Sequence, residues 1–256
     1  MWRREPQDQQ VLRADIRRWF TTPVGERHLM IQKRVLDQLL PGYFGYHLLQ
    51  LSPQSQPLYE QSPVGNQMSM GNGIDDVGVS FLGNGLQLPF ESDSVDVLIL
   101  HHMLDFFEEP QQLLREVERV ALPMGYLVIL GFNPVSAWGA WRAIARFGGD
   151  APWSGAFLSS GRIMDWLTLL NFQIDRVHYA NYDLPLNIGG ARPLPVFKGG
   201  LSRKFNLPFG AGYVIVARKQ VSTMTHIRPA WRSVRRLPQL SVVRPVSRST
   251  PGGDQA

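Results

Sequence analysis

The stretch that most constrains the fold runs from Leu86 to Pro134 and combines two apolar strands with one amphipathic helix. The expected strands, Val95 to Leu100 and Tyr126 to Gly131, are continuous apolar runs. Such runs are typical of strands that are covered on both faces of a parallel sheet. Parallel strands need a crossover connection, and the helix between them supplies it. We therefore expect a right-handed βαβ unit in an α/β sheet.

The crossover helix is predicted by agreement among its beginning, its apolar face and its end. Pro110 suits a first helical position, and Glu108 and Glu109 place negative charge near the positive end of the helix dipole. Pro123 and Gly125 predict a tight turn that ends the helix. The apolar face consists of four residues at helical spacing, Leu113, Leu114, Val117 and Val120.

The segment that leaves the first of these strands, His101 to Phe107, is expected to be a loop. It lies at the carboxyl edge of the sheet, where open α/β sheets bind their ligands. It contains two adjacent histidines, an aspartate and two phenylalanines. We therefore place the candidate functional site at this edge.

The run LPFESDSVDVLILHHMLDFFEEPQQLLREVERVALPMGYLVILGFNP resembles the second half of the class I S-adenosylmethionine-dependent methyltransferase domain, in its type 11 subgroup. The shared features are an LPF segment, a short acidic loop, a strand carrying Val-Asp, a helical L-R-E-x-x-R-V and a Pro-Gly turn. The resemblance implies a Rossmann-like, doubly wound, mostly parallel sheet of seven strands. It also implies S-adenosyl-L-methionine as the cofactor and an acceptor that the sequence does not identify.

The resemblance places cofactor-binding residues after the first strand, before the LPF segment and after the fourth strand. Asn84 matches the position that contacts the exocyclic amine of adenine, and its amide oxygen can accept that hydrogen bond. Beside two glycines, Asn84 is equally well explained as a turn residue. The full set is Leu51, Ser52, Gln54, Asn84, Gly85, Leu86, His101 and His102.

The turn after the first expected strand, Tyr46 to Leu51, departs from the family pattern. The usual form is an acidic residue followed by G-x-G-x-G, where glycines let the backbone approach the ligand and turn tightly. This chain has LSPQSQPLYEQS instead. Pro53 and Pro57 also disfavour the start of a regular helix there.

The second expected strand, Gln67 to Met70, also departs from the family pattern. Most relatives end this strand with an acid that binds both ribose hydroxyls, whereas Gly71 and Asn72 follow here. Asp75 or Asp76 either replaces that acid or belongs to a turn, and the turn is the simpler interpretation.

Methyl transfer from a sulfonium is an in-line displacement, so a protein contributes mainly alignment, worth up to ~7–11 kcal/mol, and a base where the nucleophile carries a proton. The candidates for the base are His101, His102 and Asp105, and histidine suits the role because its pKa is near neutral. Two alternatives stay open: the histidines line the cofactor, and Asp105 only begins a turn. No spacing of His, Asp or Glu predicts a metal site.

We expect three parts: an N-terminal helical segment (1–44), a methyltransferase-like domain (45–220) and a basic tail (221–256). The second N-terminal helix is expected to start with Thr22 as its N-cap. These helices either cover the cofactor site or only pack on the core. The other expected elements are a strand at Val77–Leu82, helices at Ser136–Phe147 (with Trp138, Trp141 and Ile144 on one face) and Ser160–Leu170, strands at Phe172–His178 and Tyr213–Ala217, and a long Pro- and Gly-rich loop at Ala180–Gly212.

The net positive charge of the chain is concentrated in its tail, which contains six Arg and one Asp. The tail has no helical periodicity. We expect this tail to be disordered. Its arginines around Trp231 could bind phosphate, with bases stacking on the indole, but a solvated tail is the favoured interpretation. Nucleic acid is therefore a partner that we consider but do not favour.

The 256 residues suit one domain with appendages, and 44% of them are hydrophobic. The absence of cysteine excludes disulfides and thiolate chemistry and favours a cytoplasmic location. No secretory signal and no membrane-spanning run is expected.

Three hypotheses follow. The first is an active methyltransferase, favoured by Asn84 and by the His101 to Phe107 segment. The second is a methyltransferase fold that has lost the cofactor and works as a binding or regulatory protein, favoured by the missing glycines. The third, a nicotinamide-dependent enzyme, lacks the G-x-G-x-x-G that it needs. We predict the first.

Overall fold

The computed structural model describes residues 6–71, 79–83, 85–145, 151–183 and 206–221. The chain divides into two units, Met1–Ser222 and Thr223–Ala256, and all described residues belong to the first. Several predictions fall outside the described residues: the disordered tail with Trp231, most of the long loop, and three site candidates, Asn84, Asp75 and Asp76.

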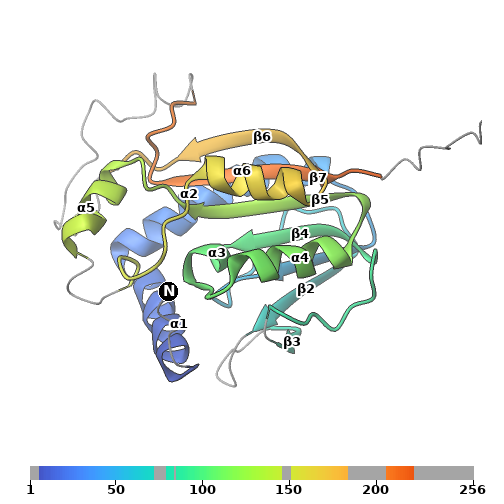
Figure 1. Ribbon diagram of the computed structural model, residues 1–256, viewed down its shortest axis with the longest axis horizontal. Helices are drawn as coiled ribbons and strands as arrows, with labels where there is room; N and C mark the ends of the chain where they lie inside the picture. Colours follow the sequence, from blue (N-terminus) through green and yellow to red (C-terminus); the bar gives the residue numbers. More distant parts are fainter. Residues whose placement is uncertain (1–5, 72–78, 84, 146–150, 184–205, 222–256) are drawn as a thin grey trace, which may run out of the picture. The chain divides into compact units, whose positions relative to one another are not determined.

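Within the described residues the core is a seven-stranded sheet of order β3-β2-β1-β4-β5-β7-β6, shown in Figure 1. Strand β7 runs antiparallel to β5 and β6, and the remaining neighbours are parallel. This is the doubly wound, mostly parallel sheet that the sequence predicts. The strands are β1 (His47–Leu51), β2 (Asn66–Gly71), β3 (Phe81–Leu82), β4 (Val95–His101), β5 (Ala121–Phe132), β6 (Phe172–Ala180) and β7 (Gly212–Lys219).

Helices cover the sheet on both faces (Figure 1). The N-terminal pair, α1 and α2, packs on one apolar cluster, and α4 and α6 pack on the other. The apolar run of β4 is continuous because its side chains alternate between the two clusters. Val97 and Ile99 belong to the first cluster, whereas Leu98 and Leu100 belong to the second. The helices are α1 (Pro6–Phe20), α2 (Pro23–Leu39), α3 (Met103–Phe106), α4 (Pro110–Val120), α5 (Ala137–Ala145) and α6 (Ser160–Leu169), with a 3-10 turn, η1, at Leu40–Gly42.

The predicted helix starts are confirmed. Thr22 Oγ1 accepts a hydrogen bond from Gly25 N at 3.2 Å and caps α2, and Pro110 stands in the first turn of α4. The four residues of the predicted apolar face of α4 are fully buried.

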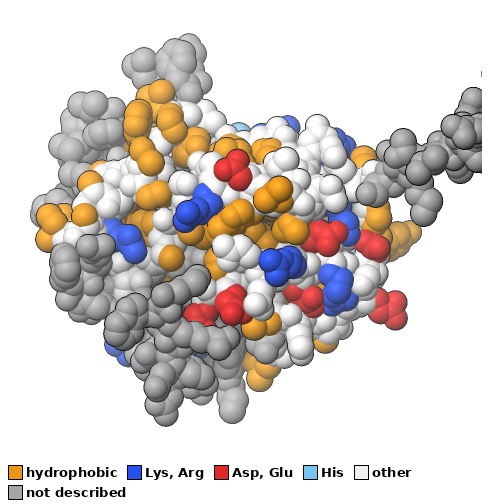
Figure 2. Space-filling view, viewed as in Figure 1, with side chains coloured by type: hydrophobic (Ala, Val, Ile, Leu, Met, Phe, Trp, Pro, Cys, Tyr) orange, Lys and Arg blue, Asp and Glu red, His pale blue; other side chains and the backbone are white. Residues whose placement is uncertain are grey.

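Outward from α4 and α6, basic and acidic side chains are interspersed on the surface, as Figure 2 shows. None of the helices in the described ranges combines the length and apolar character needed to cross a bilayer.

The tight turn predicted at Pro123 and Gly125 does not end the helix, because both residues lie inside β5. Met124 between them has a positive φ of 67°. Helix α4 ends at Val120 and the strand begins at the next residue. Ala121 pairs with Val95 and Tyr126 with Val97, so β5 carries extra residues at this point and bulges. Glycine is needed in the bulge, since a Cβ at Gly125 would lie 2.8 Å from the carbonyl oxygen of Leu122.

The predicted loop from His101 to Phe107 is also corrected. His101 is the last residue of β4, His102 takes a left-handed conformation (φ 53°), and Met103–Phe106 form the short helix α3. The residues of α3 are buried, because its apolar side chains join the two clusters. This segment is therefore part of the core and not an open loop.

Two further elements differ from expectation. In α5 only Trp138 is buried, whereas Trp141 and Ile144 are exposed, so the predicted apolar face is covered only at its start. The helix contacts the core mainly through its first turn, where Trp138 Nε1 donates to the carbonyl of Asp183 at 2.7 Å. In the described part of the third strand, only Phe81–Leu82 pair with β2.

Candidate functional site

Polar side chains gather at the carboxyl edge of the sheet, where β1 and β4 end beside α2. These side chains are polar, whereas the two clusters that cover the faces of the sheet are apolar. Its buried polar residues come from three elements and the segments that follow them: Gln32 from α2, Ser52 just after β1, and His101, His102 and Asp105 around the end of β4. Both histidines are fully buried.

These five side chains form one hydrogen-bonded chain. Ser52 Oγ lies 2.9 Å from His101 Nδ1, and His101 Nε2 lies 3.1 Å from Gln32 Oε1. The amide nitrogen of Gln32 lies 2.9 Å from His102 Nε2. His102 Nδ1 then lies 2.8 Å from Asp105 Oδ2, which also accepts from the backbone N–H of Phe132 at 3.0 Å.

One assignment of protons satisfies these four links with both imidazoles neutral. The Ser52 hydroxyl donates to His101 Nδ1, and His101 Nε2–H donates to the Gln32 carbonyl oxygen. The Gln32 amide donates to His102 Nε2, and His102 Nδ1–H donates to the Asp105 carboxylate. In this assignment His101 carries its proton on Nε2 and His102 carries its proton on Nδ1.

The ionisation of the cluster is governed by burial. Burial lowers the pKa of His102 to about 3. It also lowers the pKa of His101 well below the usual value, with help from His102 and His28. Burial raises the pKa of Asp105, while hydrogen bonds from the backbone of Phe132 and Leu158 act in the opposite direction. The imidazoles are thus neutral near pH 7.

An aromatic wall surrounds this cluster. The rings of Phe132 and His102 lie 4.1 Å apart, and Phe20 from α1 lies 5.2 Å from the ring of His101. His28 stands one helical turn before Gln32 on α2, packs 5.0 Å from Trp138 and hydrogen-bonds Asn181 at 2.8 Å. The wall excludes water from the histidines, which is the cause of their lowered pKa values.

The segment between β1 and β2 contains no helix, and all of its residues are described. Side-chain amides hold its first turn. Gln54 accepts from the N–H of Gln56 and donates to its carbonyl at 2.9 Å. Gln50, buried on β1, donates to the same carbonyl at 3.0 Å and accepts from the N–H of Leu58 at 2.8 Å. Ser52 Oγ accepts from the N–H of Gln54 at 3.2 Å. We call residues 52–58 the β1 exit loop.

A cavity of about 630 Å³ opens between the N-terminal helices and the β1 exit loop. Phe20 and Leu29 give it apolar walls, while Arg17 and Glu26 bring charge to it. Its volume is within the range of small-molecule and cofactor sites. The full lining is Arg17, Phe20, Thr21, Glu26, Leu29, Met30, Lys33, Gln54, Ser55 and Gln56.

The predicted site residues are distributed over different environments. Ser52, His101, His102 and Asp105 come together in the buried chain, and Gln54 lines the cavity. Three others do not line it: Leu51 is buried in the apolar cluster beneath α4 and α6, Gly85 lies beside Leu113 and Phe107, and Leu86 is half-buried. In the described ranges, no group of three or more His, Asp or Glu side chains is placed to hold a metal ion.

Sequence reasoning missed Gln32, His28 and Arg17. A signal was available for the first two, because they are spaced four residues apart and continue through Leu36 along the buried face of α2. Polar residues on an otherwise apolar helix face are informative, since burying them without partners is costly. Arg17 lies among several other arginines of α1, and its spacing alone does not distinguish it.

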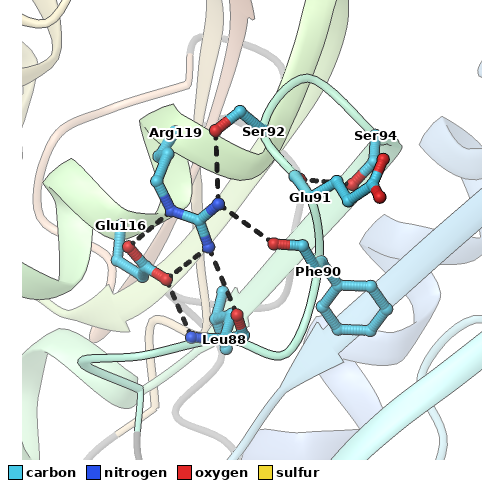
Figure 3. Close-up of polar contacts among 7 residues, drawn as sticks. All are labelled: Leu88, Phe90, Glu91, Ser92, Ser94, Glu116 and Arg119. Carbon is cyan, nitrogen blue, oxygen red and sulfur yellow. Dashed lines mark hydrogen bonds and ion pairs between the residues drawn. The ribbon is translucent and has the colours of Figure 1, made fainter.

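The LPF segment, residues 88–90, is held against α4 by an arginine and a glutamate, as Figure 3 shows. Arg119 donates to the carbonyls of Phe90 at 3.0 Å and Leu88 at 3.2 Å, and to Glu116 Oε1 at 2.7 Å. Glu116 Oε1 accepts from the N–H of Leu88 at 2.8 Å. The E-x-x-R spacing of the helix therefore anchors the segment that precedes β4.

The chain is similar to known proteins in both sequence and fold. Residues 60–129 match a family model described as a methyltransferase domain, type 11. YafS of Escherichia coli strain K12 is 31% identical over 209 residues, which are 81% of this chain and 82% of YafS.

Solved structures agree on the fold at low sequence identity. A SAM-dependent methyltransferase from Thermotoga maritima superposes with a TM-score of 0.64 and 16% identity, over 83% of this chain and 100% of that chain. A chain from the complex between the Haloferax volcanii Trm112 methyltransferase activator and a methyltransferase gives a TM-score of 0.60 and 15% identity, over 83% and 99% of the two chains.

Proposed function

The chain belongs to the class I S-adenosylmethionine-dependent methyltransferases of type 11, and we propose that it is an active enzyme whose cavity beside the β1 exit loop receives the cofactor. Its cofactor is S-adenosyl-L-methionine, as the family implies. The cavity is the observation that carries the proposal, because it lies at the carboxyl end of β1, where this class of sheet binds its ligand.

The residues around the cavity fit the chemistry of the cofactor. A guanidinium such as that of Arg17 suits a carboxylate, because its N–H groups can donate two parallel hydrogen bonds. The face of Phe20 suits a sulfonium, since aromatic rings attract cations. Gln54 and Ser55 add polar groups from the β1 exit loop. We therefore assign the methionyl part of the cofactor to this cavity.

The adenosine part is assigned from the family resemblance. Asn84, Gly85 and Leu86 would receive the adenine, with Asn84 accepting from its amine. A carboxylate for the ribose would have to come from Asp75 or Asp76, which follow β2 in the sequence. The anchored LPF segment supports this assignment, because the Arg119–Glu116 pair fixes the residues just after the adenine position.

The bound cofactor supplies a methyl group that is already activated on a sulfonium sulfur. The protein then has to align the acceptor and exclude water, which is where most of the acceleration would come from. We do not assign His101, His102 or Asp105 as the base, since these groups are buried and already hydrogen-bonded to one another. We assign them to holding the site together.

A second function is supported by the β1 exit loop. Its N–H groups at Gln54, Gln56 and Leu58 are bound to side chains of the protein, so they are not offered to a ligand as in a glycine turn. A protein of this fold without cofactor would act as a binding or regulatory module. The intact cavity favours the enzyme.

The location of the site can be tested by filling the cavity. In Leu29→Trp, an indole would occupy space beside Phe20 and should abolish the thermal stabilisation by S-adenosylhomocysteine that the wild type shows. At a ligand concentration a hundred times the Kd, that stabilisation should be about 5 °C or more. Leu167→Met, in the cluster under α6, is the matched control. A stabilised Leu29→Trp variant would place the cofactor elsewhere.

A further inference from the structure

We propose that Gln32 is a positioning residue for the cofactor: through His101 and Ser52 it holds the β1 exit loop in the shape that a glycine turn gives to other members of the fold. The inference rests on the proposed function, and it concerns how a loop without glycine can form a cofactor site.

The first step is the connection from α2 to the sheet. Gln32 is 1% exposed and lies between two histidines that are fully buried. Its oxygen accepts from His101 at 3.1 Å and its nitrogen donates to His102 at 2.9 Å. One amide therefore locks the helix that borders the cavity to the end of β4.

The second step is the connection from β4 to the loop. His101 Nδ1 accepts from the Ser52 hydroxyl at 2.9 Å, and the same hydroxyl accepts from the N–H of Gln54 at 3.2 Å. Gln54 and its neighbours Ser55 and Gln56 line the cavity. A displacement of Gln32 would thus be transmitted through three hydrogen bonds, Gln32–His101, His101–Ser52 and Ser52–Gln54, to the wall that faces the ligand.

The third step is that side chains set the shape of the loop. It contains no glycine and no helix, and its turn is set by side chains. Gln50 and Gln54 both bind the carbonyl of Gln56, which fixes the far end of the turn. Ser52 fixes the near end, and its hydroxyl is connected through His101 to Gln32.

Only glutamine meets the requirement at position 32. The side chain must accept from one imidazole and donate to the other, which an amide does and a carboxylate does not. Asparagine is shorter by one methylene, and methionine has the right length without a donor. The identity of the residue is therefore open to a sharp test.

The test measures S-adenosylhomocysteine binding to the full chain by calorimetry. Gln32→Met should weaken binding about tenfold or more, because misplacing a site wall is costly. Gln67→Met is the matched control, since the side-chain amide of Gln67 also makes two hydrogen bonds, to the carbonyls of Ser62 and Val64, but Gln67 does not line the cavity. It should bind like the wild type. Equal affinities for wild type and Gln32→Met would overturn the inference.

A pH series separates positioning from simple loss of packing. In Gln32→Glu, the carboxylate faces the unprotonated nitrogen of His102 and repels its lone pair. Lowering the pH adds one proton to the pair formed by the introduced carboxylate and His102, which then share a hydrogen bond, so binding by this variant should recover as the pH falls. Gln32→Met should show no such recovery. Equal pH profiles for the two variants would contradict the proposed role.

Hydrogen exchange distinguishes failure of this inference from failure of the proposed function. Without any ligand, the amides of Gln54 and Gln56 should exchange faster in Gln32→Met than in the wild type and in Gln67→Met. If Gln32→Met does not fold, Ser52→Ala should show the same acceleration and Ser52→Thr, which keeps the hydroxyl, should not. Unchanged exchange in Gln32→Met or Ser52→Ala overturns the positioning role, even if the wild type binds the cofactor.

Discussion

The side-chain amide of Gln32 lies 2.9 Å from Nε2 of His102, although the two residues are 70 positions apart in the sequence. This contact joins an N-terminal helix to the end of the central strand. It is a central link of the buried hydrogen-bonded chain of five polar side chains. The candidate site is therefore built jointly by α2 and the sheet, so the N-terminal helices are part of the site as well as of the core.

The buried histidines should make the protein sensitive to acid. His28, His101 and His102 have pKa values lowered by burial, so they stay neutral in the folded state while the unfolded chain takes up protons below its histidine pKa of about 6.5. Stability should fall as the pH drops through that value, by roughly 1.4 kcal/mol per pH unit for each histidine. Asp105 opposes this because its pKa is raised, but it is one group against three.

Urea unfolding between pH 7.5 and pH 5 measures this effect. A His28→Phe variant should show a shallower decline than the wild type, by about one proton, because one buried imidazole has been removed. His47→Phe is the control, since His47 is exposed. A wild-type stability that is flat over this range would show that the histidines are not neutral in the fold.

Arg119→Leu should loosen the LPF segment. The carbonyls of Leu88 and Phe90 lose a charged donor, and the expected cost is about 1–2 kcal/mol, kept modest by the partial exposure of the arginine. Thermal unfolding measures this loss of stability. The control is Arg115→Leu, because Arg115 is an exposed arginine on the same helix. The hydrogen bond from Arg119 lowers the pKa of Glu116, so this contribution should disappear as the pH falls through that lowered value. Equal stabilities of the two variants would argue against the anchor.

Asn84→Ala should weaken S-adenosylhomocysteine binding by roughly three- to tenfold, the worth of one hydrogen bond. The fold should persist, because the change removes a polar amide group and no apolar side chain. Circular dichroism and calorimetry report the two effects separately, and Gln87→Ala on the same segment is the control. Wild-type affinity in Asn84→Ala would remove the adenine contact from the proposal.

Removing the chain after Gln220 should leave the first unit folded, because β7 ends at Lys219 and completes its sheet pairing before the cut. The truncated protein should keep the far-ultraviolet spectrum and melting temperature of the full chain. Any salt-sensitive binding to nucleic acid should be lost with the six arginines. Nucleic-acid binding that survives truncation would have to come from the domain itself.

Local sequence rules predicted most of the fold. Continuous apolar runs identified β4 and β5, and the pattern from Pro110 to Val120 identified the crossover helix, because burial on two faces and helical periodicity are local signals. Pro123 and Gly125 predict a turn after the helix, whereas they lie in a bulge inside β5, because the same residue types favour both structures. The exposed face of α5 depends on where the helix meets the core, which periodicity does not report.

The site was predictable only in part. The sequence located the edge where Ser52, His101 and Asp105 meet, because topology alone places the ends of parallel strands together. The spacing on α2 could mark Gln32 as a polar residue on a buried helix face, but not its partners, which lie far along the chain. The glycine-free loop was recognised as a departure, but the side-chain amides that shape it are visible only in three dimensions.

Calorimetric titration of the purified full chain with S-adenosylhomocysteine tests the central claim most directly. We expect saturable heat with about one ligand bound per chain, as a single built cavity of this size requires. No heat and no thermal shift at millimolar ligand would contradict the cofactor site and leave the binding-module function in its place.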